Sequence, residues 1–292
     1  MNLFTIKDLE NLSGIKAHTI RIWEQRYSLI KPHRTQTNIR YYSSDELKKV
    51  LNIALLNKYG FKISHIDRMS PAEIQQKILS LSHEEAQKER IVNELIQNMI
   101  DLDMDKFEHT LDTYIMNRGI EKTIHYLVFP FLERIGILWL TNHINPAQEH
   151  LVSNIIRQKL IVGIDRAISH VKTNKKVLLF LPETEHHELG LLFIHYLLKK
   201  RGITVLYVGA SVPVKDLEYI CNLIKPDYIY THLTTVTANF SFEKFVNQVA
   251  ARIPETPLII SGQLAKHYNK KISPTVFLKK NLKEVTDYIE SI

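Results

Sequence analysis

The sequence has little cysteine and no long uninterrupted apolar run, and each shortage excludes a class of protein. The one cysteine, Cys221, lies in an apolar helical pattern, so a buried structural thiol in a reducing compartment is expected. The most apolar stretch, residues 126–140, is interrupted by Pro130, Glu133 and Arg134. The N-terminus has no basic segment followed by a long apolar core, and neither H-E-x-x-H nor paired cysteines occur. We therefore expect a cytoplasmic protein without a membrane span or a zinc site.

What the chain does have is length and positive charge. Its 292 residues are enough for two or three domains, and the formal net charge of +7 favours a polyanionic partner. Between Gly14 and Ser43 the basic residues outnumber the acidic ones, and Glu24 is the single acidic residue. The basic residues in this segment are Lys16, Arg21, Arg26, Lys31, Arg34 and Arg40. Such a local concentration predicts a surface that binds nucleic acid.

Local signals in the same segment predict a helix-turn-helix. Thr5 caps a short helix that ends at Gly14, and residues 17–25 form a second helix, on which Trp23 is expected to face the core. Residues 38–42 are expected to form a short aromatic strand.

After residue 71 the pattern changes twice. Amphipathic stretches predict long helices, and thus a four-helix bundle, over residues 84–101, 104–117, 120–140 and 146–171. Short β-rich runs then alternate with helices, which predicts a doubly wound parallel sheet. These runs are residues 176–181, 204–208, 228–232, 258–261 and 275–278. The predicted domains are residues 1–72 (all-α helix-turn-helix), 80–172 (bundle) and 174–292 (α/β, Rossmann-like or flavodoxin-like).

The first of the β-rich runs is followed by the pattern E-x-H-x-x-G, formed by Glu185, His187 and Gly190. An imidazole that leaves a strand end can ligate a metal, and a carboxylate two residues earlier can hold its other nitrogen. A glycine lets the next helix approach a bound group closely. By itself the pattern is weak, because a solvated surface histidine is the common alternative.

The head, residues 1–72, resembles the winged helix-turn-helix of MerR-type transcription regulators. Residues 19–27, 29–34 and 40–42 carry the resemblance. In that family the second helix enters the major groove and the wing touches the DNA backbone, which implies binding to double-stranded promoter DNA. The contacts implied are Lys16, His18, Thr19, Arg21 and Arg26, with Arg34, Arg40 and Tyr41 in the wing. The alternative, that the arginines only solvate a small domain, explains less of this pattern.

The rest of the chain resembles the cobalamin-binding region of methionine synthase and, with the head attached, the adenosylcobalamin photoreceptor repressors of the CarH and LitR type. In those proteins the histidine of E-x-H-x-x-G ligates cobalt from the lower face, so the resemblance implies His187 as the axial ligand and Glu185 as its partner. Their helical motif W-x9-E-H covers the upper face around the adenosyl group, which implies Trp139, Glu149 and His150. Taken singly, Trp139 would more often be a core residue and the polar pair would be solvated.

Three departures from the family pattern bear on the rest of the implied site. Residues 231–233 read T-H-L where the family has S-x-L, and residues 261–262 read S-G where it has G-G, so the channel for the nucleotide tail is expected to be narrower. Leu140 stands where the photoreceptors have a histidine after the cap tryptophan. The further cofactor contacts implied are Gly190, Gly209, Thr231, Leu233, Ser261 and Gly262.

The resemblance implies a DNA-binding transcription regulator, expected to be a repressor and not an enzyme, that senses light through adenosylcobalamin or another cobalamin. A homo-oligomer, either a dimer or a tetramer, is expected. Two alternatives stay open: a MerR-like regulator whose tail binds another ligand or none, and a cobalamin-dependent methyltransferase or mutase subunit. The basic head disfavours the second, and the remaining length holds no separate substrate-binding barrel.

Overall fold

A computed structural model describes residues 3–27, 29–140, 144–234, 240–270 and 272–292, without the side chains of residues 137–140. The chain forms two compact units, residues 1–156 and 157–292. Within the described part of the chain, every helix is too short or too polar to cross a membrane.

The first unit begins with two short helices and a small antiparallel sheet: α1 (Ile6–Ser13), α2 (Ala17–Arg26), β1 (His33–Arg34) and β2 (Arg40–Tyr41). Thr5 and Asp8 form the capping box that starts α1, and Gly14 ends it with φ 73°. Trp23 is buried, as predicted. The strand expected over residues 38–42 is shorter, because only residues 40 and 41 pair with β1, while Tyr42 forms a separate bridge with Phe4.

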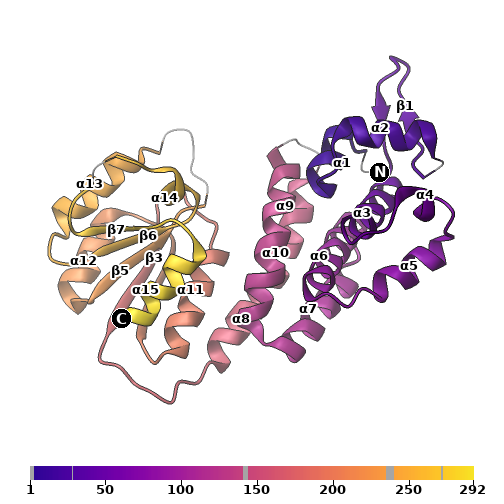
Figure 1. The fold of residues 1–292 in the computed structure, drawn as a ribbon. Helices are drawn as coiled ribbons and strands as arrows, with labels where there is room; N and C mark the ends of the chain where they lie inside the picture. The colour runs from indigo at the N-terminus through magenta and orange to yellow at the C-terminus, as the bar shows by residue number, and fades with distance from the viewer. Residues whose placement is uncertain (1–2, 28, 141–143, 235–239, 271) are drawn as a thin grey trace. The chain divides into compact units, whose positions relative to one another are not determined.

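The remainder of this unit is helical (Figure 1). Its helices are α3 (Ser44–Lys58), α4 (Ile63–Ile66), α5 (Pro71–Leu79), α6 (Glu84–Asp101), α7 (Met104–Arg118), α8 (Ile120–Thr123), the π-helix η1 (Ile124–Val128), α9 (Phe129–Leu140) and α10 (Pro146–Arg166), whose last residues belong to the second unit. The helix predicted over residues 120–140 thus contains a π-helical turn just before Pro130, which has no N–H to donate to the preceding turn. Helix α10 ends at Arg166, earlier than predicted.

The second unit is a doubly wound α/β fold, as predicted. Five parallel strands lie in the order β4-β3-β5-β6-β7: β3 (Lys176–Pro182), β4 (Thr204–Val212), β5 (Tyr228–His232), β6 (Leu258–Ser261) and β7 (Val276–Lys279). The helices are α11 (Leu189–Lys200), α12 (Val214–Ile224), α13 (Phe242–Arg252), α14 (Gln263–His267) and α15 (Leu282–Ser291). Helices α11 and α15 cover one face of the sheet, and α12 and α13 cover the other (Figure 1).

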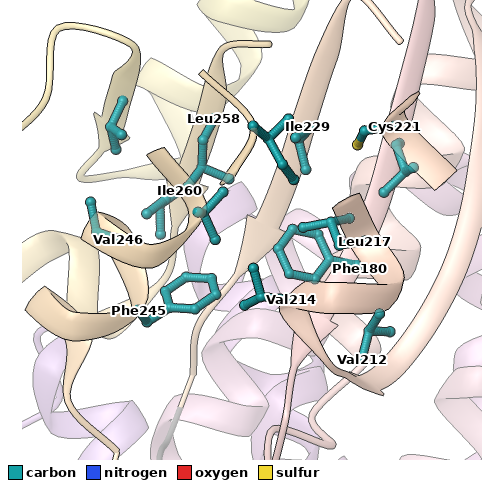
Figure 2. Close-up of a cluster of buried hydrophobic side chains, with 14 of the residues drawn as sticks. Phe180, Val212, Val214, Leu217, Cys221, Ile229, Phe245, Val246, Leu258 and Ile260 are labelled. Carbon is teal, nitrogen blue, oxygen red and sulfur yellow. The ribbon is translucent and has the colours of Figure 1, made fainter. Parts of the chain in front are cut away.

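The face under α12 and α13 holds a continuous apolar core (Figure 2). Phe180 of β3 and Ile260 of β6 pack with Leu217 of α12 and Phe245 of α13 in this cluster. Cys221 is buried in the same cluster, and burial raises the pKa of its thiol to about 11. This core fixes the carboxyl ends of β3, β5 and β6, which is where ligands bind in open parallel sheets.

Candidate functional site

The loop after β3 holds a buried carboxylate at the centre of a hydrogen-bond cluster. The Glu185 side chain is 1 % exposed. Its Oε1 accepts bonds from the backbone N–H groups of His186 and His187, each at 2.9 Å, and its Oε2 accepts from the N–H of Thr234 at 3.2 Å. Oε1 also lies 2.7 Å from Nδ1 of His187. Because these donors surround the carboxylate, its position and that of the imidazole are fixed together.

His187 is held in the orientation that a metal ligand requires. Its side chain is 53 % exposed although its partner is buried, so the ring reaches from the loop toward the surface. With Nδ1 bound to Glu185, Nε2 is the nitrogen that would ligate cobalt, and the carboxylate would raise its basicity. These residues could hold the cobalt of a cobalamin, and the role of His187 as its ligand, which the resemblance implies, stays a prediction.

Gly190, in the first turn of α11, makes a close approach to β5. A Cβ atom at this position would lie 2.3 Å from Cδ2 and 2.5 Å from Nε2 of His232. The imidazole of His232 therefore occupies the space that any side chain at residue 190 would need. The glycine of the motif is necessary here for packing as well as for any bound group.

His232 is held in place by a chain of hydrogen bonds. The hydroxyl of Tyr230 donates to Oγ of Ser261 at 2.7 Å, and the same Oγ lies 2.7 Å from Nδ1 of His232. The serine proton is then available to Nδ1, which assigns a neutral ring protonated on Nε2. Burial lowers the pKa of His232 to about 4, against a smaller opposing effect of Glu185, which agrees with a neutral ring.

Thr231 and Gly262, two of the other implied contacts, lie at the carboxyl ends of β5 and β6. Alternation along β5 places Thr231 on the face opposite Tyr230 and His232, where its Oγ1 is buried and has no hydrogen-bond partner among the described atoms. Gly262 follows β6 with φ 98°, and a Cβ atom there would lie 2.2 Å from the carbonyl oxygen of Leu233. Both glycine contacts are packing against protein atoms, whereas the hydroxyl of Thr231 leaves one hydrogen bond that a ligand could make.

A second polar cluster, which the sequence did not suggest, lies beside Gly209 of β4. Glu188 accepts a hydrogen bond from Tyr207 at 2.8 Å and pairs with Arg157 at 2.7 Å. A Cβ atom at Gly209 would lie 3.7 Å from Oε1 of Glu188, which is ordinary contact. Burial, and then the bond to Glu188, raise the pKa of Tyr207. The cluster fixes the start of α11 next to the His187 loop.

The W-x9-E-H residues belong to the first unit. Trp139 lies in α9, and its side chain, like that of Leu140, is outside the described residues. Glu149, in the first turn of α10, accepts a hydrogen bond from the hydroxyl of Ser153, and its Oε2 lies 3.3 Å from Nδ1 of His150. His150 is 72 % exposed, so it is accessible to a ligand but is not positioned by burial.

In the head, most of the predicted DNA contacts are at the surface. Residues 16, 18, 21, 26 and 34 are exposed, and Thr19 is partly buried. Lys16 pairs with Glu10 at 3.3 Å, and Arg34 donates to Oδ1 of Asn38 at 2.6 Å. Because the cations themselves are exposed, they can exchange these partners for phosphate oxygens.

Arg40 differs from the other cations of the head. Its Nε lies 3.3 Å from Oε2 of Glu24, whose side chain is 6 % exposed and also accepts a hydrogen bond from the hydroxyl of Tyr42. Burial, and then the bond to Glu24, raise the pKa of Tyr42. The resemblance implies that Arg40 and Tyr41 contact DNA from the wing, which stays a prediction; in the structure Arg40 also joins β2 to α2 through Glu24.

Comparisons with known proteins find family matches for two parts of the chain. Residues 4–73 match the family described as "MerR HTH family regulatory protein", and residues 91–162 match the "B12 binding domain". The chain is 27% identical over 269 residues to the HTH-type transcriptional repressor CarA of Myxococcus xanthus, covering 91% of this chain and 89% of the relative. It is 25% identical over 276 residues to CarH of the same organism, covering 91% and 90%.

Among solved structures, the monomethylamine corrinoid protein of Methanosarcina barkeri aligns with a TM-score of 0.52 at 11% identity. The alignment covers 70% of this chain and 100% of that chain. This likeness concerns the fold alone.

Proposed function

Because this chain is a MerR-type helix-turn-helix protein with a B12-binding domain, homologous to the CarA and CarH repressors, we propose that it represses transcription and senses light through bound adenosylcobalamin. The observation that carries the cofactor half of this proposal is the bond between Nδ1 of His187 and the buried carboxylate of Glu185, at 2.7 Å. The exposed cations of the head carry the DNA half.

In the proposed mechanism, the head is a winged helix-turn-helix. Helix α2 enters the major groove of promoter DNA, with Arg21 and Arg26 directed at it, and the β1–β2 hairpin is the wing, with Arg34 against the backbone. Cations that neutralise phosphates release bound counterions, so affinity should fall steeply with salt. Sequence is read by whichever of these side chains reach base edges.

His187 would ligate cobalt through Nε2, while Glu185 keeps Nδ1 occupied and the ring fixed. Bound adenosylcobalamin would supply a cobalt–carbon bond that light can cleave. The helical domain, a four-helix bundle in this proposal, would cover the adenosyl group with Trp139, Glu149 and His150: the indole as a flat apolar lid and the polar pair as hydrogen-bond partners. Contacts that exist only while the adenosyl group is present would favour one of two assemblies of a dimer or tetramer, and thereby DNA binding.

The test combines size-exclusion chromatography with absorbance spectra of the protein and adenosylcobalamin, kept dark and then exposed to green light. DNA retardation at low salt is measured on the same samples with a random-sequence duplex library. We expect His187→Ala to lose the spectrum of an imidazole-ligated cobalt. His186→Ala, an exposed neighbour in the same loop, is the matched control and should retain it. Unchanged affinity and spectrum in His187→Ala would show that the ligand assignment is wrong.

A second candidate, a regulator whose tail binds another ligand or none, is favoured by one observation: His232, which is hydrogen-bonded to Ser261, fills the space beside Gly190. Dark-prepared protein that retards DNA but retains no corrinoid would support this candidate. A cobalamin-dependent methyltransferase or mutase subunit would instead bind corrinoid and fail to retard any duplex at low salt.

A further inference from the structure

The space next to the Cα atom of Gly190 is occupied by the side chain of His232, and this bears on which corrinoids can bind. The ring of His232 lies where a Cβ atom of Gly190 would be, and it is anchored through Nδ1 to Ser261 at 2.7 Å. Residues 190 and 261 come from the start of α11 and the end of β6, on either side of β5. The imidazole thus lies between the start of the helix and the strand end, and it packs against a glycine three residues after the proposed cobalt ligand.

The chemistry of cobalamin makes this gap important. Free cobalamin carries its own lower axial base, a benzimidazole on a nucleotide tail. If Nε2 of His187 takes the lower position on cobalt, that base must leave the metal and be housed elsewhere. The crevice at the carboxyl ends of parallel strands is the place that the fold provides, and in this protein it holds His232.

The occupant of the gap and its anchor depend on each other. Ser261 supplies the hydroxyl that His232 binds, and it in turn accepts from the hydroxyl of Tyr230. A glycine at residue 261 would offer neither the hydroxyl nor the bulk. The two side chains act as one plug that needs both of its parts.

Building on the proposed function, we infer that His232 is a specificity-determining plug, which must turn out of the gap before a corrinoid with an intact nucleotide tail binds through His187. A corrinoid without that tail, such as adenosylcobinamide, does not need the gap and binds without moving His232. The protein therefore discriminates among corrinoids by their lower tail. The cost is the loss of the bond to Ser261 and of the packing on Gly190.

The experiment measures the affinity of the full-length protein for adenosylcobalamin and for adenosylcobinamide, by absorbance titration in the dark, in wild type and His232→Ala. We expect His232→Ala to bind adenosylcobalamin about tenfold more tightly, the effect of one lost hydrogen bond with its packing, and adenosylcobinamide with unchanged affinity. His195→Ala is the matched control: this partly buried ring stacks on Tyr207, with centroids 5.4 Å apart, and should alter neither affinity.

Ser261→Gly provides a second variant that removes the anchor and leaves the imidazole in place. It should also tighten adenosylcobalamin binding selectively, by less than His232→Ala, and it tests the plug if that variant does not fold. Equal changes for both corrinoids, or none in a protein that binds both, would overturn the inference. If no variant binds either corrinoid, the proposed function itself fails, and this result is distinct from a loss of selectivity.

Discussion

The head and the crevice of the second unit present functional groups in opposite ways. In the head, Arg21 and Arg26 are long cations at the surface, whereas in the crevice Glu185 and Ser261 are short, buried and hydrogen-bonded. An exposed side chain contributes little to folding, and a buried polar one cannot be removed without leaving its partners unsatisfied. Substitutions at the strand ends should therefore change stability and ligand binding together, and substitutions of exposed residues in the head should change binding alone.

The largest effect is expected from Glu185→Ala. It removes the acceptor of three backbone N–H groups and of the His187 ring, so we predict a loss of about 3 kcal/mol in the free energy of unfolding. Cobalamin affinity should fall about 10–100-fold, because the ligand ring loses its orientation. Chemical denaturation and absorbance titration measure the two quantities. Glu183→Ala, an exposed carboxylate in the same loop, should change neither. Equal stability of the two variants would show that the buried carboxylate of Glu185 does not stabilise the fold.

A double-mutant cycle on Gly190 and His232 should give the next largest effect. Gly190→Ala forces a methyl group against the imidazole, and we predict a cost of about 2 kcal/mol, typical of overpacking. In a His232→Ala background most of that cost should disappear, giving a coupling energy of about 1–2 kcal/mol. Denaturation midpoints of the four proteins provide the cycle. Strict additivity would mean that the helix shifts and the imidazole stays where it is.

Local and long-range features of the chain also differ in how well they could be predicted from the sequence. The strands at residues 228–232 and 258–261 and the helix at 84–101 were predicted at their observed bounds, because apolar periodicity and capping are local properties of the chain. Helix α5 was missed, although Ser70 and Glu73 form its capping box and Pro71 is its first residue; it is only nine residues long, and Ile78 is its one buried residue.

The candidate site likewise contains one contact that could be predicted from the sequence and one that could not. Glu185 and His187 are two residues apart, so their hydrogen bond could be predicted from spacing, and the structure confirms that bond. The contact between Gly190 and His232 joins residues 42 positions apart, and only the register of β5 beside β3 brings them together. Alternation along β5 puts residue 232 on the same face as Tyr230, but which helix covers that face is a tertiary fact.

A smaller effect is expected from acid. Burial lowers the pKa of both His195 and His232 to about 4 from the ordinary 6.5. Between pH 4 and pH 6.5 the unfolded chain binds more protons at these two histidines than the folded chain does. The stability that the two buried neutral rings contribute is therefore complete above pH 6.5 and is lost as the pH falls toward 4. Denaturation across this range should show falling stability and a shallower slope in His195→Asn. A slope unchanged by that substitution would show that the ring is not buried in solution.

The smallest effects on stability are expected in the head, where two arginines provide the sharpest contrast. Arg26 is exposed, and we predict that Arg26→Ala changes the free energy of unfolding by less than about 0.5 kcal/mol. It should still weaken DNA binding at every sequence tested and reduce the salt slope by about 1 if it contacts a phosphate.

Arg40→Ala instead removes the cation from Glu24, a carboxylate that is 6 % exposed, so we predict a loss of about 1 kcal/mol in the free energy of unfolding. Thermal denaturation beside DNA titration at several salt concentrations separates the two. If Arg40→Ala weakened DNA binding with no loss of stability, Arg40 would be a DNA contact like Arg26, and its ion pair with Glu24 would not stabilise the fold.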